Sequence, residues 1–181
     1  SYEDIESYYR IFTMLDTRQD ELVKFVCSAL IVTGKYYLLN SYNSRGLELL
    51  EKAAVSAAGK TGFLSYIIEV LMEFGKTAEA QGVLKRFPPN TQSGSEYLSM
   101  DLLVAKATLR PGVLLQKARD LVKKGIETAT IYEILISASI DAGFTEAAAD
   151  LVREAAKKWP AQAAKFERLL KQAPESISAA C

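Results

Sequence analysis

Apolar residues recur at three- and four-residue spacing along most of the chain, and the clearest case lies between residues 128 and 160. Ile131 and Leu135 share one side of a first predicted helix, and Ala148 and Val152 share one side of a second. Gly143 lies between them at a predicted turn. This spacing is typical of amphipathic helices. Both apolar sides are buried only if the helices fold back on each other and a neighbour covers the remainder, as in a helical-pair repeat.

The same pattern predicts helices along the whole chain. No alternating strand pattern interrupts it, so we expect an all-α fold with a single repeat domain over residues 1–172. This domain is predicted to contain four helix pairs, at residues 19–58, 63–87, 95–124 and 129–158. We expect an additional N-terminal helix, a C-terminal capping helix and a frayed tail, at residues 2–15, 161–172 and 173–181 respectively.

One stretch, residues 35–44, does not fit the pattern. Gly34 is expected to end the helix before it, and a helix is expected to follow from Arg45 to about residue 58. Residues 36–39 are apolar or aromatic, whereas asparagine and serine in residues 40–44 favour turns. The stretch could extend the earlier helix, begin the next one early, or form an ordered loop. Its composition favours a loop with a short helical part.

The turns between paired helices repeat at a fixed interval. Gly75 and Gly143 are 68 residues apart, which is twice thirty-four. The same interval predicts an intermediate turn near position 109, where residues 109–112 read Leu-Arg-Pro-Gly. Counting back from Gly75 predicts another turn at position 41, inside residues 35–44. Self-similarity at one period indicates a repeat architecture.

The best unit, residues 129–162, carries a characteristic set of side chains: Tyr132, Leu135, Gly143, Ala148, Val152, Ala155 and Pro160. A looser unit carries Leu64, Ile67, Leu71, Gly75, Ala80, Leu84 and Phe87. This pattern resembles the tetratricopeptide repeat (TPR). Ile68 and Ile136 depart from it, because that motif prefers a small residue there, and they should open the packing within each pair slightly. The resemblance implies a TPR-like α-solenoid, a right-handed superhelical array of antiparallel helix pairs.

The charge balance argues against several classes of partner. Basic and acidic residues number 22 each, whereas nucleic-acid binders usually carry a basic excess. The longest apolar run, residues 25–32, is shorter than the roughly 18 residues that cross a bilayer, so we expect no membrane partner.

The two cysteines are expected to remain unpaired, with Cys27 buried and Cys181 in the tail. We expect a cytoplasmic location and, because the sequence begins at Ser1, a piece of a longer protein.

The residue types give no indication of catalysis. The chain contains no histidine, the commonest general base and metal ligand near neutral pH, and no calcium-loop spacing. Residues 59–62 read Gly-Lys-Thr-Gly, but Ala54 stands where a phosphate-binding loop needs glycine and no strand is predicted before it. These residues are interpreted as a turn between helices. We therefore expect no enzyme activity, no cofactor and no metal.

The TPR resemblance implies that the first helix of each pair lines a groove. The candidate partner-binding residues are the outward ones of those helices: Lys24, Ser28, Ser65, Glu69, Met72, Glu73, Thr130, Glu133, Ser137 and Asp141. Their four carboxylates favour a basic or mixed-charge peptide. The alternative is that they are ordinary solvated helix surfaces. The lysine–asparagine pattern of family members that clamp acidic chaperone tails is not found at these positions.

The leading hypothesis is therefore a non-catalytic protein-interaction module, a scaffold, adaptor or chaperone-like groove for a peptide or helix. The alternative is a single-stranded RNA-binding module, because residues 123–126 followed by 131–136 also resemble the pentatricopeptide repeat. Glu133 counts against it, since that family usually carries a base-reading amide or hydroxyl there. Self-association is a further possibility, through Tyr2, Tyr8 and Tyr9 or through residues 36–42.

Overall fold

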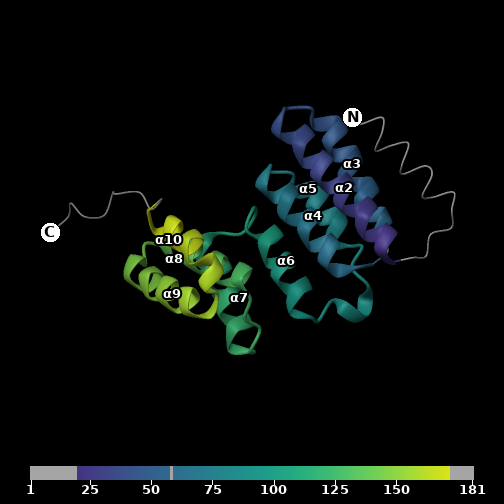
Figure 1. Cartoon of the computed structure of the whole chain (residues 1–181). Helices are drawn as coiled ribbons and strands as arrows, with labels where there is room; N and C mark the ends of the chain where they lie inside the picture. Colours follow the sequence, from purple (N-terminus) through teal and green to yellow (C-terminus); the bar gives the residue numbers. More distant parts are fainter. Residues whose placement is uncertain (1–19, 58, 172–181) are drawn as a thin grey trace. The chain divides into compact units, whose positions relative to one another are not determined.

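The computed structural model describes residues 20–57 and 59–171, and this part of the chain is all-α (Figure 1). It contains nine α-helices: α2 (Asp20–Leu39), α3 (Asn43–Ser56), α4 (Thr61–Glu73), α5 (Thr77–Leu84), α6 (Ser95–Ala105), α7 (Pro111–Lys123), α8 (Ala129–Asp141), α9 (Thr145–Lys158) and α10 (Ala163–Lys171). Short 3-10 turns occupy Pro89–Thr91 and Pro160–Gln162. The all-α prediction is confirmed. The helix expected over residues 2–15 and the tail expected over 173–181 lie outside the described residues.

The helices pack in sequential pairs, and their starting positions repeat. The first helices α4, α6, α8 and α10 begin 34 residues apart, at Thr61, Ser95, Ala129 and Ala163. The second helices α3, α5, α7 and α9 begin at the same interval, at Asn43, Thr77, Pro111 and Thr145. The predicted period is therefore confirmed by the starts of α3 to α10, whereas α2 begins at Asp20, seven residues before the position that this interval gives.

The turns within pairs also follow this period. Gly75 and Gly143 have positive φ angles of 67° and 83°, and Ser41, 34 residues before Gly75, has a φ of 66°. The turn predicted at position 41 is therefore present, with a serine in the left-handed conformation that glycine adopts in the other two. The third pair turns differently. There Arg110 is extended and Pro111 is the first residue of α7, a position that proline favours.

Helix α2 does not end at Gly34 but continues to Leu39, and α3 begins at Asn43. Residues 35–44 therefore extend the earlier helix and begin the next one early, and the favoured loop with a short helical part is wrong. Gly34 is buried against α3, where an added Cβ would lie 3.1 Å from the carbonyl oxygen of Gly46. Leu38 continues the buried side one turn later. Gly34 thus serves close packing between the two helices rather than helix termination. Helix α3 consequently begins at Asn43, two residues earlier than expected.

By length and composition alone, Glu21–Leu39 of α2 is long and apolar enough to cross a membrane. The expectation of no such run is wrong, because α2 continues through Gly34 and joins residues 25–32 to the apolar residues after them. Core helices of soluble proteins also meet this criterion. Here Cys27, Leu30 and Ile31 on one side of α2 are buried. The absence of a membrane partner stays a prediction.

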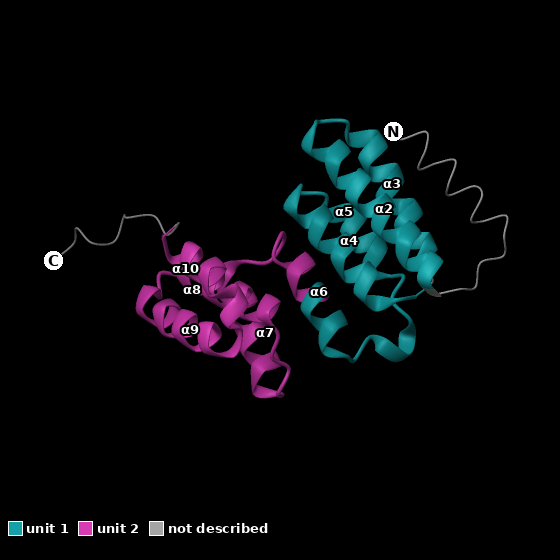
Figure 2. Ribbon diagram, in the orientation of Figure 1, with its two compact units in different colours: residues 1–100 teal, residues 101–181 magenta. Residues whose placement is uncertain are grey.

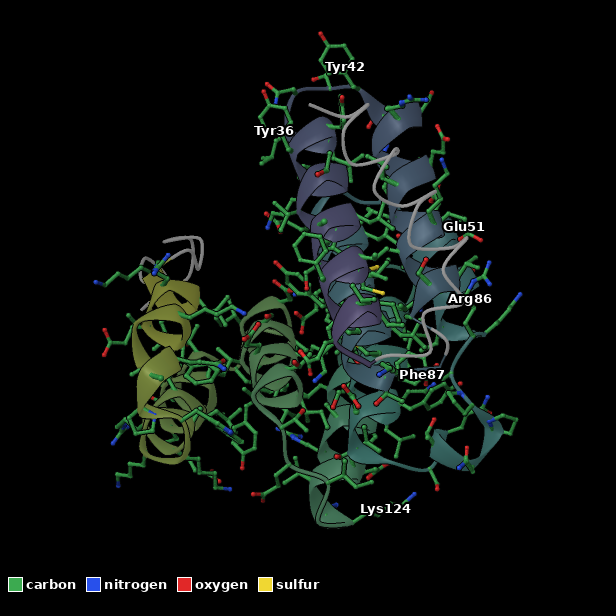
Figure 3. The ribbon with its side chains drawn as sticks, turned by 45° about the vertical axis from the view of Figure 1, so that its right-hand side comes forward. Tyr36, Tyr42, Glu51, Arg86, Phe87 and Lys124 are labelled. Carbon is green, nitrogen blue, oxygen red and sulfur yellow. The ribbon has the colours of Figure 1, made fainter. Side chains whose placement is uncertain are left out.

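The chain divides into two compact units, residues 1–100 and 101–181, with the boundary inside α6 (Figure 2). In unit 1, Arg86 forms an ion pair with Glu51 of α3, and Arg86 itself follows the end of α5 (Figure 3). The largest buried side chains of unit 1 are Leu30, Ile31, Leu49, Leu50, Leu64, Ile67, Ile68, Leu71 and Phe87. The expectation of one repeat domain stays a prediction.

Unit 2 contains two adjoining apolar clusters. The first joins the end of α6 to α7 and α8 through Leu102, Leu114, Leu115, Ala118, Ile131, Ile134, Leu135 and Ala138. The second joins α8, α9 and α10 through Tyr132, Ile136, Val152, Ala155 and Phe166. Trp159 packs between Tyr132 and Phe166, at centroid distances of 5.1 and 6.4 Å. Trp159 therefore contacts the last helix through Phe166.

The close approach of α2 and α3 predicts that Gly46→Ala destabilises the protein. The new methyl group would lie 2.7 Å from Leu38 Cγ and 2.9 Å from the carbonyl oxygen of Gly34. Leu38 can rotate away, but the carbonyl moves only if the helices separate. Such overpacking costs about 1–3 kcal/mol, more than the ~1 kcal/mol that alanine gains over glycine in a helix. Urea unfolding followed by circular dichroism should show a lower midpoint.

The matched control is Gly82→Ala on α5. No neighbouring atom lies within 4 Å of a Cβ added there, so the helix-propensity gain should raise the urea midpoint. Equal stabilisation by the two substitutions would show that Gly46 is not at a tight contact.

Candidate interaction surfaces

The six candidate residues of unit 1 lie on α2 and α4, but they are not all available to a partner. Ser65 is buried, and its hydroxyl donates a hydrogen bond to Oε1 of Glu96 in the first turn of α6, at 3.0 Å. Met72 is half-buried. The exposed members are Lys24, Ser28, Glu69 and Glu73. Ser65 therefore has a structural contact, and the other predicted residues of this unit keep at least part of their side chains accessible.

An ion pair joins the two first helices of unit 1. Lys35 Nζ of α2 donates a hydrogen bond to Oε2 of Glu73 on α4 at 2.6 Å, and this bond raises the pKa of Lys35. Tyr66, an exposed aromatic residue of α4, also acts electrostatically on the same ammonium group. The sequence analysis missed Lys35, because it placed this lysine in a loop. Once α2 is extended to Leu39, Lys35 lies two turns after Ser28 on the same side.

The four candidate residues of unit 2 lie on α8, and two of them are held by neighbouring lysines. Lys165 of α10 pairs with Oε1 of Glu133 at 2.5 Å. Lys106 donates to the hydroxyl of Ser137 at 3.3 Å, and that hydroxyl donates to the carbonyl oxygen of Glu133 at 2.6 Å. Thr130 is half-buried. Asp141 is exposed and makes no side-chain hydrogen bond or ion pair with the described residues.

These pairs change the expected electrostatics of the candidate surface. Of the four carboxylates predicted to attract a basic peptide, Glu73 and Glu133 each already have a lysine partner. Glu69 and Asp141 remain exposed on α4 and α8. A partner would therefore meet less uncompensated negative charge than the sequence suggests, since an ion pair presents little net charge to its surroundings. A preference for basic peptides stays a prediction.

Helix α2 also carries an exposed apolar stripe, here termed the α2 stripe, formed by Val32, Tyr36 and Leu39. These side chains are 65%, 61% and 62% exposed, and their spacing of four and three residues places them on one side of the helix. Figure 3 shows Tyr36 projecting from the end of α2, near Tyr42 of the following turn. Large apolar side chains clustered in this way are unusual on a free surface.

The repeat period shows what is distinctive about the α2 stripe. Residues 34, 68 and 102 positions after Tyr36 are Val70, Val104 and Ala138, in the three following first helices. They are 1%, 3% and 1% exposed, whereas Tyr36 is 61% exposed. Apolar residues at this position of the repeat are thus normally covered. Helix α2 keeps a large apolar residue there but leaves it open to solvent.

A separate cleft of about 420 Å³ opens in unit 2 between α7, α8 and α9. Tyr132 and Leu135 of α8 form its buried part. The remaining lining residues come from α7, α9 and the segment between α7 and α8: Arg119, Val122, Lys123, Glu127, Ala147, Asp150, Leu151 and Glu154. Apolar and charged side chains therefore meet in one cavity, which we term the unit 2 cleft.

A hydrogen-bonded network ties the tyrosine of this cleft to α9. The Tyr132 hydroxyl donates to Oε1 of Glu154 at 2.5 Å and accepts from Lys158 Nζ at 2.8 Å. Lys158 also pairs with Glu154 at 2.8 Å and with Glu127 at 2.7 Å. Burial raises the pKa of Tyr132, and the hydrogen bond from Lys158 lowers the pKa of Glu154. The hydrogen bond to Glu127 is the main cause of the raised pKa of Lys158.

The sequence analysis identified Tyr132 as a characteristic residue of the best repeat unit but not as part of a polar network. A buried tyrosine usually needs a hydrogen-bond partner for its hydroxyl, and this requirement could have indicated a polar contact at Tyr132. The identity of the partners was not readable, because Glu154 and Lys158 lie 22 and 26 residues away in sequence. Sequence spacing alone therefore does not predict that Glu154 and Lys158 contact Tyr132.

Two other sequence interpretations are confirmed. The Gly-Lys-Thr triplet lies at the turn between α3 and α4, with Gly59 at a φ of 78° and Thr61 as the first residue of α4. Cys27 is buried, and burial raises the pKa of its thiol to about 11. Because the thiolate is the reactive form, this thiol is poorly suited to nucleophilic chemistry.

Comparison of the chain with protein-family models, curated protein sequences and solved structures finds no match.

The Tyr132 network predicts a pH-dependent stability difference between the natural protein and Glu154→Gln. A carboxyl group whose pKa is lowered on folding stabilises above its unfolded pKa, ordinarily about 4.5, and loses this effect as the pH falls through its folded pKa. The Glu154 side chain is 48% exposed and thus screened by solvent, so we expect a loss of about 1 kcal/mol at pH 7. Urea midpoints at pH 7 and pH 3 should show the gap closing at the lower pH.

Arg153→Gln provides the control, because Arg153 pairs with Asp150 on the outer surface of the same helix and is 74% exposed. Its effect should stay within about 0.5 kcal/mol at both pH values. A gap for Glu154→Gln that is undiminished at pH 3 would contradict an electrostatic origin.

Proposed function

We propose that this chain is a non-catalytic protein-interaction module that binds a peptide or an α-helix on its first-helix surface. The fold that we propose for it is a TPR-like array of antiparallel helix pairs with a right-handed superhelical twist. The 34-residue interval between successive first helices supports this proposal. So does the left-handed residue at each of positions 41, 75 and 143, since a repeat array places equivalent turns at equal intervals.

The α2 stripe is the observation that carries the functional proposal. Val32, Tyr36 and Leu39 expose apolar surface on a helix whose other side is already packed. Exposed apolar patches of this kind mark protein-interaction surfaces, and tyrosine is enriched in them. Residues equivalent to Tyr36 in the later first helices are covered, so we expect the partner of the stripe to be an α-helix or a peptide that becomes helical there.

The charges beside the α2 stripe suit a partner with one apolar side. Lys35, which directly precedes Tyr36, already donates to Glu73 of α4, so the charge of this lysine is compensated. Lys24 of α2 and Glu69 of α4 are exposed and give these two first helices a polar surround for the stripe. Apolar contacts would supply affinity, and the polar surround would restrict the orientation of the partner.

Chemistry of the described residues also favours binding over catalysis. Catalysis of acyl or phosphoryl transfer needs a nucleophile, a base and an orienting group within reach of one another. Within residues 20–57 and 59–171, the one cysteine is buried with a raised pKa, and the Tyr132 network uses its donors and acceptors internally. A binding role requires none of these groups.

The proposal predicts that peptides selected by display on the intact chain lose affinity when the stripe is made polar. Val32→Ser combined with Tyr36→Ser should weaken binding at least about tenfold, since a central aromatic contact commonly contributes more than 1.4 kcal/mol. Val55→Ser on α3 is the matched control, because Val55 is 56% exposed but lies outside the stripe. It should change affinity less than about twofold, as expected of a residue outside the interface. Fluorescence polarisation with labelled peptides gives both values.

Three outcomes would contradict the proposal. Equal losses in the stripe variant and in Val55→Ser would remove the stripe as the site. Concentration-dependent dimerisation that Val32→Ser abolishes would identify a second copy as the occupant. A salt-sensitive shift of single-stranded RNA, with no selected peptide, would instead favour the RNA-binding alternative.

A further inference from the structure

We infer that the unit 2 cleft is a binding site for a ligand that carries a carboxylate next to an apolar group, with the carboxylate between Arg119 and Lys123. This site lies on α7, α8 and α9 and shares no residue with the α2 stripe. It therefore goes beyond the proposed function and does not depend on it.

The net charge of the cleft is positive once the partners of its lining residues are counted, because Arg119, Lys123, Lys158 and Arg153 stand against three carboxylates. Its three acidic lining residues all have basic partners: Glu127 and Glu154 pair with Lys158, and Asp150 pairs with Arg153. Its two basic lining residues, Arg119 and Lys123, make no side-chain hydrogen bond or ion pair with any described residue. An anionic group entering the cleft would thus find two cations, Arg119 and Lys123, that have no acidic partner among the described residues.

The spacing of the two cations suits a single carboxylate. Arg119 and Lys123 are four residues apart on α7, so they lie on the same side of the helix and repel each other. An anion between them would relieve this repulsion. A guanidinium can give a carboxylate two parallel hydrogen bonds, and a lysine ammonium can add a third.

The rest of the lining favours an apolar group beside the carboxylate. Leu135 is buried in the cleft, and Val122 and Leu151 are half-buried on α7 and α9. The volume of about 420 Å³ falls within the range of small-ligand sites, roughly 300–1,000 Å³. An aliphatic side chain or a short alkyl chain would cover these residues and remove apolar surface from water.

Binding in the cleft can be followed without a label. Trp159 is the single tryptophan of the chain, and its ring lies 5.1 Å from the ring of Tyr132, which lines the cleft. Its indole is half-buried between Tyr132 and Phe166. A ligand that contacts Tyr132 changes the surroundings of this pair and hence the emission of Trp159.

The test titrates the intact chain with three probes and follows Trp159 emission and isothermal heat. The first is an N-acetylated tripeptide ending in leucine with a free carboxylate, the second is the same peptide with an amidated end, and the third is decanoate. We expect a dissociation constant of about 1 mM or below for at least one carboxylate. We expect at least about tenfold weaker binding of the amide, because it lacks the charge.

Variants then locate the site. Arg119→Gln combined with Lys123→Gln should weaken carboxylate binding at least about tenfold, and the exposed positions of both residues should leave the fold intact by circular dichroism. Lys117→Gln is the matched control, because Lys117 is an exposed cation of α7 outside the cleft lining. It should change affinity less than about twofold, as expected when a screened distant charge is removed.

Each outcome decides the inference. Binding of decanoate alone indicates a free carboxylic acid as the natural ligand, binding of the tripeptide acid alone indicates a chain terminus, and both support the inference. Equal binding of the acid and the amide overturns it, as does an equal effect of the double variant and Lys117→Gln. The absence of binding by both carboxylates at about 10 mM overturns it as well, since even a small well-matched ligand should bind more tightly.

Discussion

Each helix pair of this chain depends on one constraint, the space available where its two helices pack closest. In the first pair that place is occupied by Gly34 and Gly46, where an added Cβ would contact backbone of the other helix. At the same positions of the repeat, later pairs carry Ile68 with Ala80, Leu102 with Leu114 and Ile136 with Ala148, all buried. A pair with two glycines can bring its backbones closer than a pair with two leucines, because side-chain volume sets the separation of packed helices.

The glycine contact also explains the length and the exposed surface of α2. Gly34 lies within the helix because α3 approaches it there, so the apolar residues after it continue α2 rather than form a loop. This extension brings Lys35 to Glu73 on α4 and places Tyr36 and Leu39 in line with Val32. The candidate surface of unit 1 is therefore a consequence of the contact between α2 and α3 on the buried side of the same helix.

The sequence predicts the local and periodic features of this fold better than its polar contacts. The all-α class, the 34-residue period and the turn at position 41 follow from spacing, which is readable along the chain. Gly34 was misread because a glycine after an apolar run is typical of a helix end, and only the neighbouring Gly46 shows that it serves packing. The pairing of Glu73 and Glu133 with lysines of other helices was not predictable, because it depends on which helices become neighbours.

The two surfaces differ in the physical basis of the affinity that they can provide. The α2 stripe offers apolar area, so contacts there gain free energy mainly from removing that area from water. The unit 2 cleft offers two like charges above an apolar base, so its affinity would include an electrostatic part that dissolved salt screens. On these proposals the stripe would select by shape and helical spacing, whereas the cleft would select by the presence of one anionic group. The two proposals together therefore predict that the chain distinguishes two kinds of ligand, one by apolar area and one by charge.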